Sequence, residues 1–199
     1  MINPQASTRK KVNVRRMTII SLLSAISIML SMIPLGYIQI GPLAITTMCI
    51  PVMIGGIIEG PMVGMVVGLI FGLTSMFRGM AGMAGVTGFV FINPLVSVLP
   101  RIFIGLVSYY SFKLSMKIIK NTYVSGLIAG GMASITNTVG VLGMIYVLYA
   151  AEYAKALGQS AGTAKALLMG IATTNGIAEA LGGALVVSAV VVVLKKSKI

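Results

Sequence analysis

The residues best suited to chemistry in this chain are a few polar side chains set inside long apolar runs. Arg101 lies in the stretch NPLVSVLPRIFIG, and the acidic residues closest to it in the sequence are Glu59 and Glu152. Glu179 lies in a later apolar run, four residues after Asn175 and therefore on the same face of a helix. An ionisable group in such a run usually faces a cavity or a partner, because burying its charge in apolar surroundings is costly. These residues indicate a binding site.

Three roles are open for Arg101. Its planar guanidinium can bind a substrate carboxylate through two hydrogen bonds, it can form a buried salt bridge with Glu179 that fixes helix register, or it can extend to the membrane interface. At 1.5 Å per residue, Arg101 lies about 9 Å along its helix from Leu95, whereas Glu179 lies about 21 Å along its helix from Lys165. This difference in depth makes a direct bridge awkward, so we favour the substrate carboxylate.

Other polar residues are placed to line the same site. Asn137 and Asn175 bring uncharged hydrogen-bonding groups, and Arg78 brings a second cation, for which extension to the interface is the alternative. The first connection between apolar runs brings a tyrosine and threonines, and such tyrosines also serve as interface anchors. The predicted substrate-binding residues are Arg101, Asn137, Asn175, Glu179, Arg78, Tyr37, Thr47 and Asn93.

The groups that most enzymes and metal sites require are scarce. The chain has 3 acidic residues, no His and a single Cys, Cys49. Ser-His and Cys-His pairs are therefore excluded, as is an intrachain disulfide, and a metal site built from side chains is not expected. No G-x-x-x-x-G-K-[ST] loop occurs, so the chain does not hydrolyse ATP by that device. We expect neither an enzyme nor a bound cofactor.

The composition is that of an integral membrane protein. Of 199 residues, 57% are hydrophobic and 9% are charged, whereas soluble domains carry about 25% charged residues. The net charge of +12 would suggest nucleic acid in a soluble protein, but here the basic residues cluster at the ends of apolar runs. That pattern instead indicates orientation in a membrane.

Six apolar runs are candidates for membrane-spanning helices. A span needs about 20 residues, and the predicted helices cover 17–35, 43–58, 61–77, 95–116, 122–150 and 166–194. The second run is short and contains Pro51. The first run has no small-residue cleavage site after it, so we interpret it as a retained span rather than a signal peptide. The predicted fold class is an all-α polytopic membrane protein, a bundle of six transmembrane helices.

Basic residues predict the orientation of this bundle. Eleven of the 15 basic residues fall on one side of the predicted spans: Arg9, Lys10, Lys11, Arg15, Arg16, Lys113, Lys117, Lys120, Lys195, Lys196 and Lys198. Cytoplasmic segments carry such an excess, so both termini are predicted to be cytoplasmic. The predicted organisation is a basic tail at 1–14, a transmembrane substrate-binding domain at 15–195 and a second tail at 196–199. The opposite connection, 78–94, is either a flexible linker or a lid over a ligand.

Two faces carry small residues. Gly64, Gly68 and Gly72 recur every four residues, and such a face allows two helix backbones to approach closely. It serves either packing within the bundle or contact with another protein. The same alternatives apply to Ser21 and Ala25 in the first run.

These features together resemble a known family, the substrate-binding subunits (S components) of energy-coupling factor (ECF) vitamin transporters. The resemblance covers about 12–196 and rests on the six-run layout, the basic tails and the phrases SLLSAIS, TTMCIPVMIGGIIEGPMVGMVVGLIFGLTS and NPLVSVLPRIFIGLV. The phrases are similar to the branch that includes pantothenate transporters. Cys49 stands where related sequences often carry a histidine.

The resemblance implies a function and partners. An S component captures a vitamin from outside, has no ATPase of its own, and joins a transmembrane coupling subunit and two cytoplasmic ATPase subunits in the plasma membrane of a prokaryote. Ser21 and Ala25 match the face that contacts the coupling subunit. Pantothenate suits Arg101 and the neutral donors, and the alternatives are folate, cobalamin, biotin or lipoate, or a membrane structural or assembly protein.

Overall fold

A computed structural model describes residues 14–33, 36–40 and 43–197 of the chain, without the side chains of 37–40 and 43–45. Five helical segments in this part are long and apolar enough to cross a membrane. They are α1 (Val14–Met32), α3 (Pro61–Met80), the pair α4 (Pro94–Ser97) and α5 (Leu99–Ile119), α6 (Thr122–Ala156) and α7 (Ala164–Lys196). A sixth apolar helix, α2 (Cys49–Glu59), is shorter. The helical bundle predicted from the sequence is therefore present.

The second predicted helix differs most from the structure. Residues 43–58 were expected to form one helix, but strands β1 (Tyr37–Ile40) and β2 (Leu43–Thr46) pair antiparallel, with Tyr37 opposite Thr46, and α2 begins only at Cys49. The strands are rich in β-branched residues, which favour extended backbone. Pro51 lies in the first turn of α2, where its missing N–H has no helical partner to lose. It therefore fits at the start of this helix without interrupting it.

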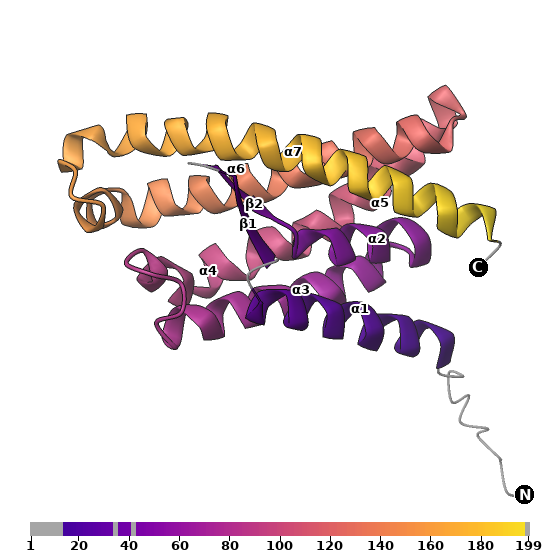
Figure 1. Cartoon of the computed structure of the whole chain (residues 1–199), viewed down its shortest axis with the longest axis horizontal. Helices are drawn as coiled ribbons and strands as arrows, with labels where there is room; N and C mark the ends of the chain where they lie inside the picture. Colours follow the sequence, from indigo (N-terminus) through magenta and orange to yellow (C-terminus); the bar gives the residue numbers. More distant parts are fainter. Residues whose placement is uncertain (1–13, 34–35, 41–42, 198–199) are drawn as a thin grey trace, which may run out of the picture.

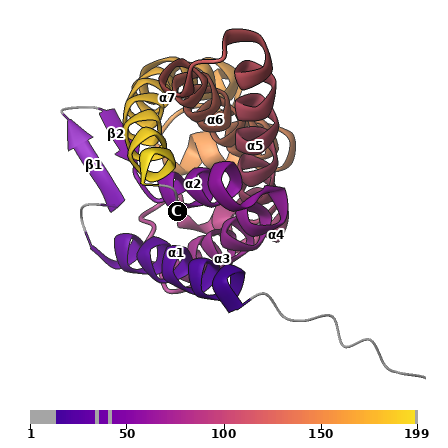
Figure 2. The ribbon, with the colours of Figure 1, turned by 90° about the vertical axis from the view of Figure 1, so that its right-hand side faces the viewer.

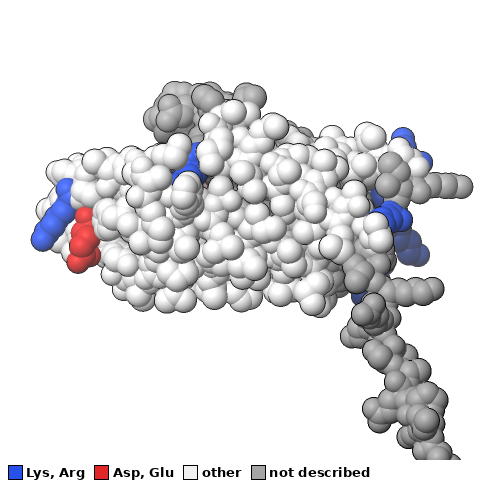
Figure 3. All heavy atoms as spheres, turned by 90° about the horizontal axis from the view of Figure 1, so that it is seen from below, with Lys and Arg blue, Asp and Glu red and all other residues white. Residues whose placement is uncertain are grey.

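The helices form an elongated bundle with α2 at its centre. The long helices α6 and α7 lie side by side, and α1 lies on the opposite side of the bundle (Figures 1 and 2). Helix α1 begins and α7 ends at one end of the bundle, which we call the terminal end (Figure 1). On the face in Figure 3, Lys and Arg gather mainly at the two ends, and most of the length between them is uncharged. This distribution fits a bundle that spans a membrane.

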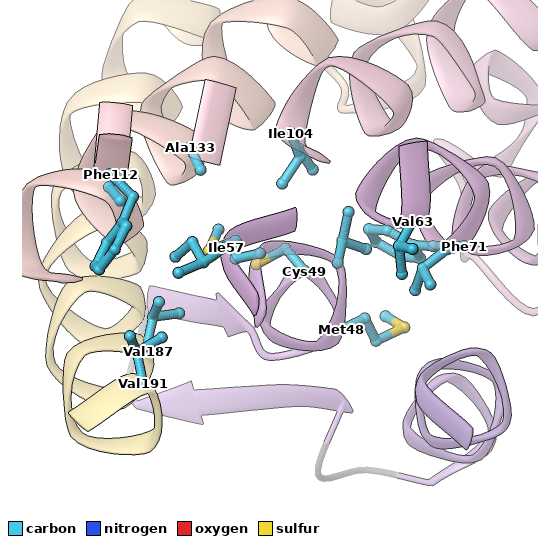
Figure 4. Packing of buried hydrophobic residues seen from close by; sticks show 14 residues of the cluster. Met48, Cys49, Ile57, Val63, Phe71, Ile104, Phe112, Ala133, Val187 and Val191 are labelled. Atoms are coloured by element: carbon cyan, nitrogen blue, oxygen red, sulfur yellow. The ribbon is translucent and has the colours of Figure 1, made fainter. Parts of the chain in front are cut away.

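The main hydrophobic core surrounds α2. Met53 and Val52 of α2 are fully buried. They belong to one hydrophobic cluster with Val63, Ile104 and Val187, which α3, α5 and α7 contribute, and Figure 4 shows these three side chains around Cys49 and Ile57 of α2. Helix α2 is thus enclosed by the longer helices, and this burial can stabilise it although it is too short to cross the membrane.

The glycine face of α3 packs inside this bundle. A Cβ atom on Gly64 would lie 2.8 Å from the Cα of Gly105, and one on Gly68 would lie 2.3 Å from the carbonyl oxygen of Arg101. A Cβ atom on Gly72 would lie 2.7 Å from the Cα of Val98. All three contacts are to α5 or to the residue before it, so the face serves internal packing and not a contact with another protein.

Helix α1 buries one side and exposes the other. Ser24, Ser27 and Ser31 are buried against the bundle, whereas Ser21 and Ala25 are exposed. Of the five candidate spans, α1 has the smallest buried share, 17%. Packing within the chain therefore does not account for the small residues at positions 21 and 25.

Candidate functional site

A cavity of about 430 Å³ lies in the half of the bundle away from the terminal end. Its walls come from the end of β2, from α3, α5, α6 and α7, and from the segment that joins α3 to α4. Its polar lining consists of Thr46, Arg78, Arg101, Asn137, Thr138, Asn175 and Glu179. Its apolar lining includes Phe71, Phe91, Val141 and Leu142. Such a mixture of apolar walls and a few polar groups is typical of a small-molecule site.

Arg101 is held firmly at one wall of the cavity. It lies in the first turn of α5 and is 6% exposed. Its Nη1 donates a hydrogen bond to the carbonyl oxygen of Val96 at 2.6 Å, and its guanidinium carbon lies 5.5 Å from the ring centroids of both Phe71 and Phe91. A cation between two aromatic faces gains electrostatic attraction from both rings. These contacts fix the position of a positive charge that lines the cavity.

Glu179 lies at another wall and is held by different partners. Its Oε1 accepts hydrogen bonds from the backbone N–H of Thr46, at 3.0 Å, and from the hydroxyl of the same residue. Its Oε2 accepts one from the hydroxyl of Thr138 at 3.2 Å. Between the described side chains of Arg101 and Glu179 no salt bridge forms, although both line the cavity. The carboxylate instead connects β2 and α6 to α7.

Two asparagines bring acceptor atoms to the same space. The Oδ1 atoms of Asn137 and Asn175 are buried and have no hydrogen-bond partner among the described residues, and both residues line the cavity. A buried acceptor without a partner is costly, by about 1–3 kcal/mol. A ligand that carries hydroxyl or amide donors would satisfy both atoms.

The connection after α3 also contributes to the cavity. Arg78, in the last turn of α3, donates through Nη2 to the carbonyl oxygen of Met83 at 3.5 Å, and the Met83 N–H donates back to the carbonyl oxygen of Arg78 at 3.0 Å. Met83, Ala84 and Phe91 of this segment line the cavity. Segment 78–94 therefore covers part of the site, which favours the lid over the linker.

Among the predicted binding residues whose side chains the structure describes, Thr47 and Asn93 do not line the cavity. The side chain of Tyr37 lies outside the described part of the chain. Thr47 donates its N–H to the carbonyl oxygen of Gly36 beside the hairpin, at 3.1 Å. Asn93 caps α4 by accepting from the N–H of Leu95 at 2.9 Å, and its Nδ2 donates to the hydroxyl of Tyr149 at 3.1 Å. Asn93 thus has a structural role at the start of α4.

The sequence analysis did not predict Thr138, Phe71 or Phe91, and it included Thr46 only among the threonines of the first connection. Thr46 and Thr138 hold the Glu179 carboxylate, while Phe71 and Phe91 hold the Arg101 guanidinium. The two threonines are direct neighbours in the sequence of the predicted Thr47 and Asn137. The two phenylalanines carry no sequence signal that separates them from core residues, because their role depends on the arginine that the fold brings between them.

The comparisons with known proteins agree with this architecture. A solved structure of ThiT from Listeria monocytogenes superposes with a TM-score of 0.56 at 20% identity, covering 92% of this chain and 94% of that one, which shows a shared fold. The pantothenate transporter PanT of Leuconostoc mesenteroides is 28% identical over 177 residues, 83% of this chain and 85% of the relative. The sequence model of one family, "ECF transporter, substrate-specific component", matches residues 15–191.

The matched family fits the rest of the molecule. Its members are transporter components and not enzymes, in agreement with the scarcity of catalytic groups in this chain. The bundle of apolar helices makes the chain a multi-pass membrane protein. With most of its length matched, the chain belongs to the family of substrate-specific components of ECF transporters.

Proposed function

We propose that this protein captures pantothenate from outside the cell for ATP-driven uptake. The observation that carries the proposal is the cavity in which the fixed Arg101 cation lies together with the acceptor atoms of Asn137 and Asn175. Pantothenate has one carboxylate for the arginine, and its hydroxyls and amide N–H are donors for the asparagines. The relative named as a pantothenate transporter supports the same vitamin.

The size of the cavity supports a small ligand. Its volume of about 430 Å³ lies toward the lower end of the range for small-molecule sites, about 300–1,000 Å³. Cobalamin and folate are much larger than pantothenate and are disfavoured. Biotin and lipoate also carry a carboxylate, but they offer fewer hydroxyl donors for the two asparagines.

The remaining parts of the proposal concern orientation and partners. The chain functions in the plasma membrane of a prokaryote with both termini in the cytoplasm, and the cavity then opens toward the outside. It acts with a transmembrane coupling subunit and two cytoplasmic ATPase subunits. The coupling subunit contacts α1 at Ser21 and Ala25, which are exposed on a helix with little buried surface.

The vitamin is tested by calorimetry on the purified protein. We expect pantothenate to bind, and Arg101→Ala to weaken its binding by about 150-fold, the equivalent of about 3 kcal/mol for a buried charged hydrogen-bonded contact. The alcohol analogue, in which CH₂OH replaces the carboxylate, should bind weakly to both proteins. Lys155→Ala, an exposed cation that does not line the cavity, is the matched control and should bind as the wild type does.

Two results would contradict the pantothenate assignment. One is equal affinity of the wild type for pantothenate and its alcohol analogue. The other is a different small molecule, identified by mass spectrometry, that remains bound to the protein after purification from cells.

The coupling face is tested by co-purification with the coupling subunit. Ala25→Trp places a bulky ring on the exposed face of α1 and should abolish co-purification while pantothenate binding stays unchanged. Leu185→Trp, at an exposed position of α7, is the control and should leave both intact. Co-purification of the Ala25→Trp protein at the wild-type level would remove α1 from the proposed interface.

A further inference from the structure

An apolar groove runs along the outer surface of the bundle between α6 and α7. It consists of two adjoining hollows of about 230 Å³ and 330 Å³, which share Val139 and Ala172 as lining residues. The first hollow continues to Leu181, and the second continues to Tyr146 and Lys165. This groove is separate from the cavity that contains Arg101.

Small residues create the groove and large apolar residues border it. Ala172, Gly176 and Ala180 follow one another at intervals of four on α7, and all three line the groove. Val139 of α6 and Leu181 of α7 border it, and each is 63% exposed. The hollow is therefore open on the surface of the bundle and is not a void in its core.

The surroundings of the groove identify an acyl chain as its occupant. Both helices are candidate membrane spans, so the groove faces lipid and not water. From Lys165 to Leu181 the groove extends about 24 Å along α7 at 1.5 Å per residue. Half of the hydrocarbon core is about 15 Å thick. A lipid of one leaflet can thus lie in the groove from the interface past the middle of the membrane.

Charge at the mouth of the groove specifies the head group. Lys165 lies in the first turn of α7, is exposed, and lines the hollow together with the half-exposed Tyr146. An ammonium group and a phenol hydroxyl both donate hydrogen bonds to phosphate oxygens. Glu152, an acidic residue on the last turns of α6, does not line the groove. We propose that this groove binds an anionic phospholipid, with its acyl chain between α6 and α7 and its phosphate at Lys165.

The groove and the cavity share a wall. Thr138 and Leu142 line both. The hydroxyl of Thr138 points to Glu179 in the cavity, and its Cγ2 lies on the side of Gly176, at 3.0 Å from where a Cβ atom would be. A lipid chain in the groove therefore supports one wall of the site from behind. The lipid site does not depend on which substrate the cavity holds.

The proposal is tested by photo-crosslinking of the purified full-length chain in phosphatidylcholine vesicles. Trace phosphatidylglycerol or phosphatidylcholine carries a diazirine on its acyl chain, and mass spectrometry measures the crosslinks to groove residues of α6 and α7. We expect about fivefold more crosslinks from phosphatidylglycerol, the ratio that one basic side chain at a membrane surface supplies. Lys165→Gln should bring the ratio close to one, and Lys165→Arg should retain it. Ala172→Phe should reduce groove crosslinks from both probes.

Matched variants separate this site from a general effect of charge or bulk. Lys155→Gln removes an exposed lysine near the same end of the bundle that does not line the groove, and it should keep the wild-type ratio. Leu185→Phe enlarges an exposed residue outside the groove and should keep the wild-type yield. An equal yield from both probes in the wild type, an equal loss in the two lysine variants, or the absence of groove crosslinks would overturn the proposal.

Discussion

The two halves of the bundle differ in how regularly their helices pack. Toward the terminal end, helices meet backbone to backbone: a Cβ atom on Gly64 would lie 2.8 Å from the Cα atoms of both Gly56 and Gly105, and one on Gly126 would lie 2.7 Å from the Cα of Ser188. Such contacts leave no room between helices. They fix the helix positions mainly through shape and dispersion, because the small residues, glycine and serine, let the backbones approach closely.

The cavity half is irregular where the other half is regular. Helices α4 and α5 are separated at Val98, α6 has a non-helical backbone at Tyr149, and a hairpin and a 3₁₀ segment, η2 (Gly88–Ile92), replace helix at its border. Polar side chains lie between the helices here and keep them apart. The comparison shows how one small bundle can hold a cavity without losing rigidity. The closely packed half fixes the positions of helices whose other ends form the cavity walls.

Gly68 is the point where the two halves meet, and its replacement should have the largest effect. A Cβ atom there would lie 2.3 Å from the carbonyl oxygen of Arg101, so Gly68→Leu must push α3 away from α5. We expect a loss of about 3 kcal/mol or more of unfolding free energy, as for severe overpacking. Thermal unfolding in detergent measures this loss. Gly170→Ala, at a helical glycine with open space around it, should stay at least as stable as the wild type, and equal stability of the two variants would refute the comparison.

The glycine face and the polar residues could be predicted to different extents from the sequence. The spacing of Gly64, Gly68 and Gly72 predicted a close helix contact, and Arg101, Asn137, Asn175 and Glu179 were selected as polar groups inside apolar runs; the structure brings these four to one cavity. Local patterns suffice for these residues because a membrane span must be mostly apolar, so each polar residue within it stands out in the sequence.

Other features depend on contacts that no local pattern contains. The short α2 is stable because the longer helices surround it, so the length rule for spans did not apply to residues 43–58. Thr46 and Thr138, from two different elements, donate hydrogen bonds to the Glu179 carboxylate, and no salt bridge forms between the described side chains of Arg101 and Glu179. Whether two buried charges pair is decided by these third partners, which only the fold brings together.

The Arg101–Glu179 relation can be tested within the cavity half. If Glu179 positions β2 and α6 and the two charges do not fix helix register together, Glu179→Gln should weaken pantothenate binding by about tenfold, since it replaces a charged acceptor by a neutral one. Combining it with Arg101→Ala should not restore folding or binding. Calorimetry and thermal unfolding of the single and double variants provide the measurement. Greater stability in the double variant than in Arg101→Ala alone would support the register role instead.

We expect the smallest effect from replacing Phe91, the residue of segment 78–94 whose ring contacts the Arg101 guanidinium. Phe91→Leu keeps an apolar side chain but removes the aromatic ring of Phe91, whose centroid lies 5.5 Å from the guanidinium carbon, an interaction of about 1 kcal/mol. Pantothenate affinity should therefore fall by about fivefold, while binding of the alcohol analogue should hardly change, because only the carboxylate depends on the orientation of the cation. Phe89→Leu alters the same segment at a ring that contacts Tyr149 and not Arg101, so it should spare the carboxylate preference. If both variants lower the affinities for pantothenate and for the alcohol analogue equally, segment 78–94 only covers the cavity. The Phe91 ring then does not orient Arg101.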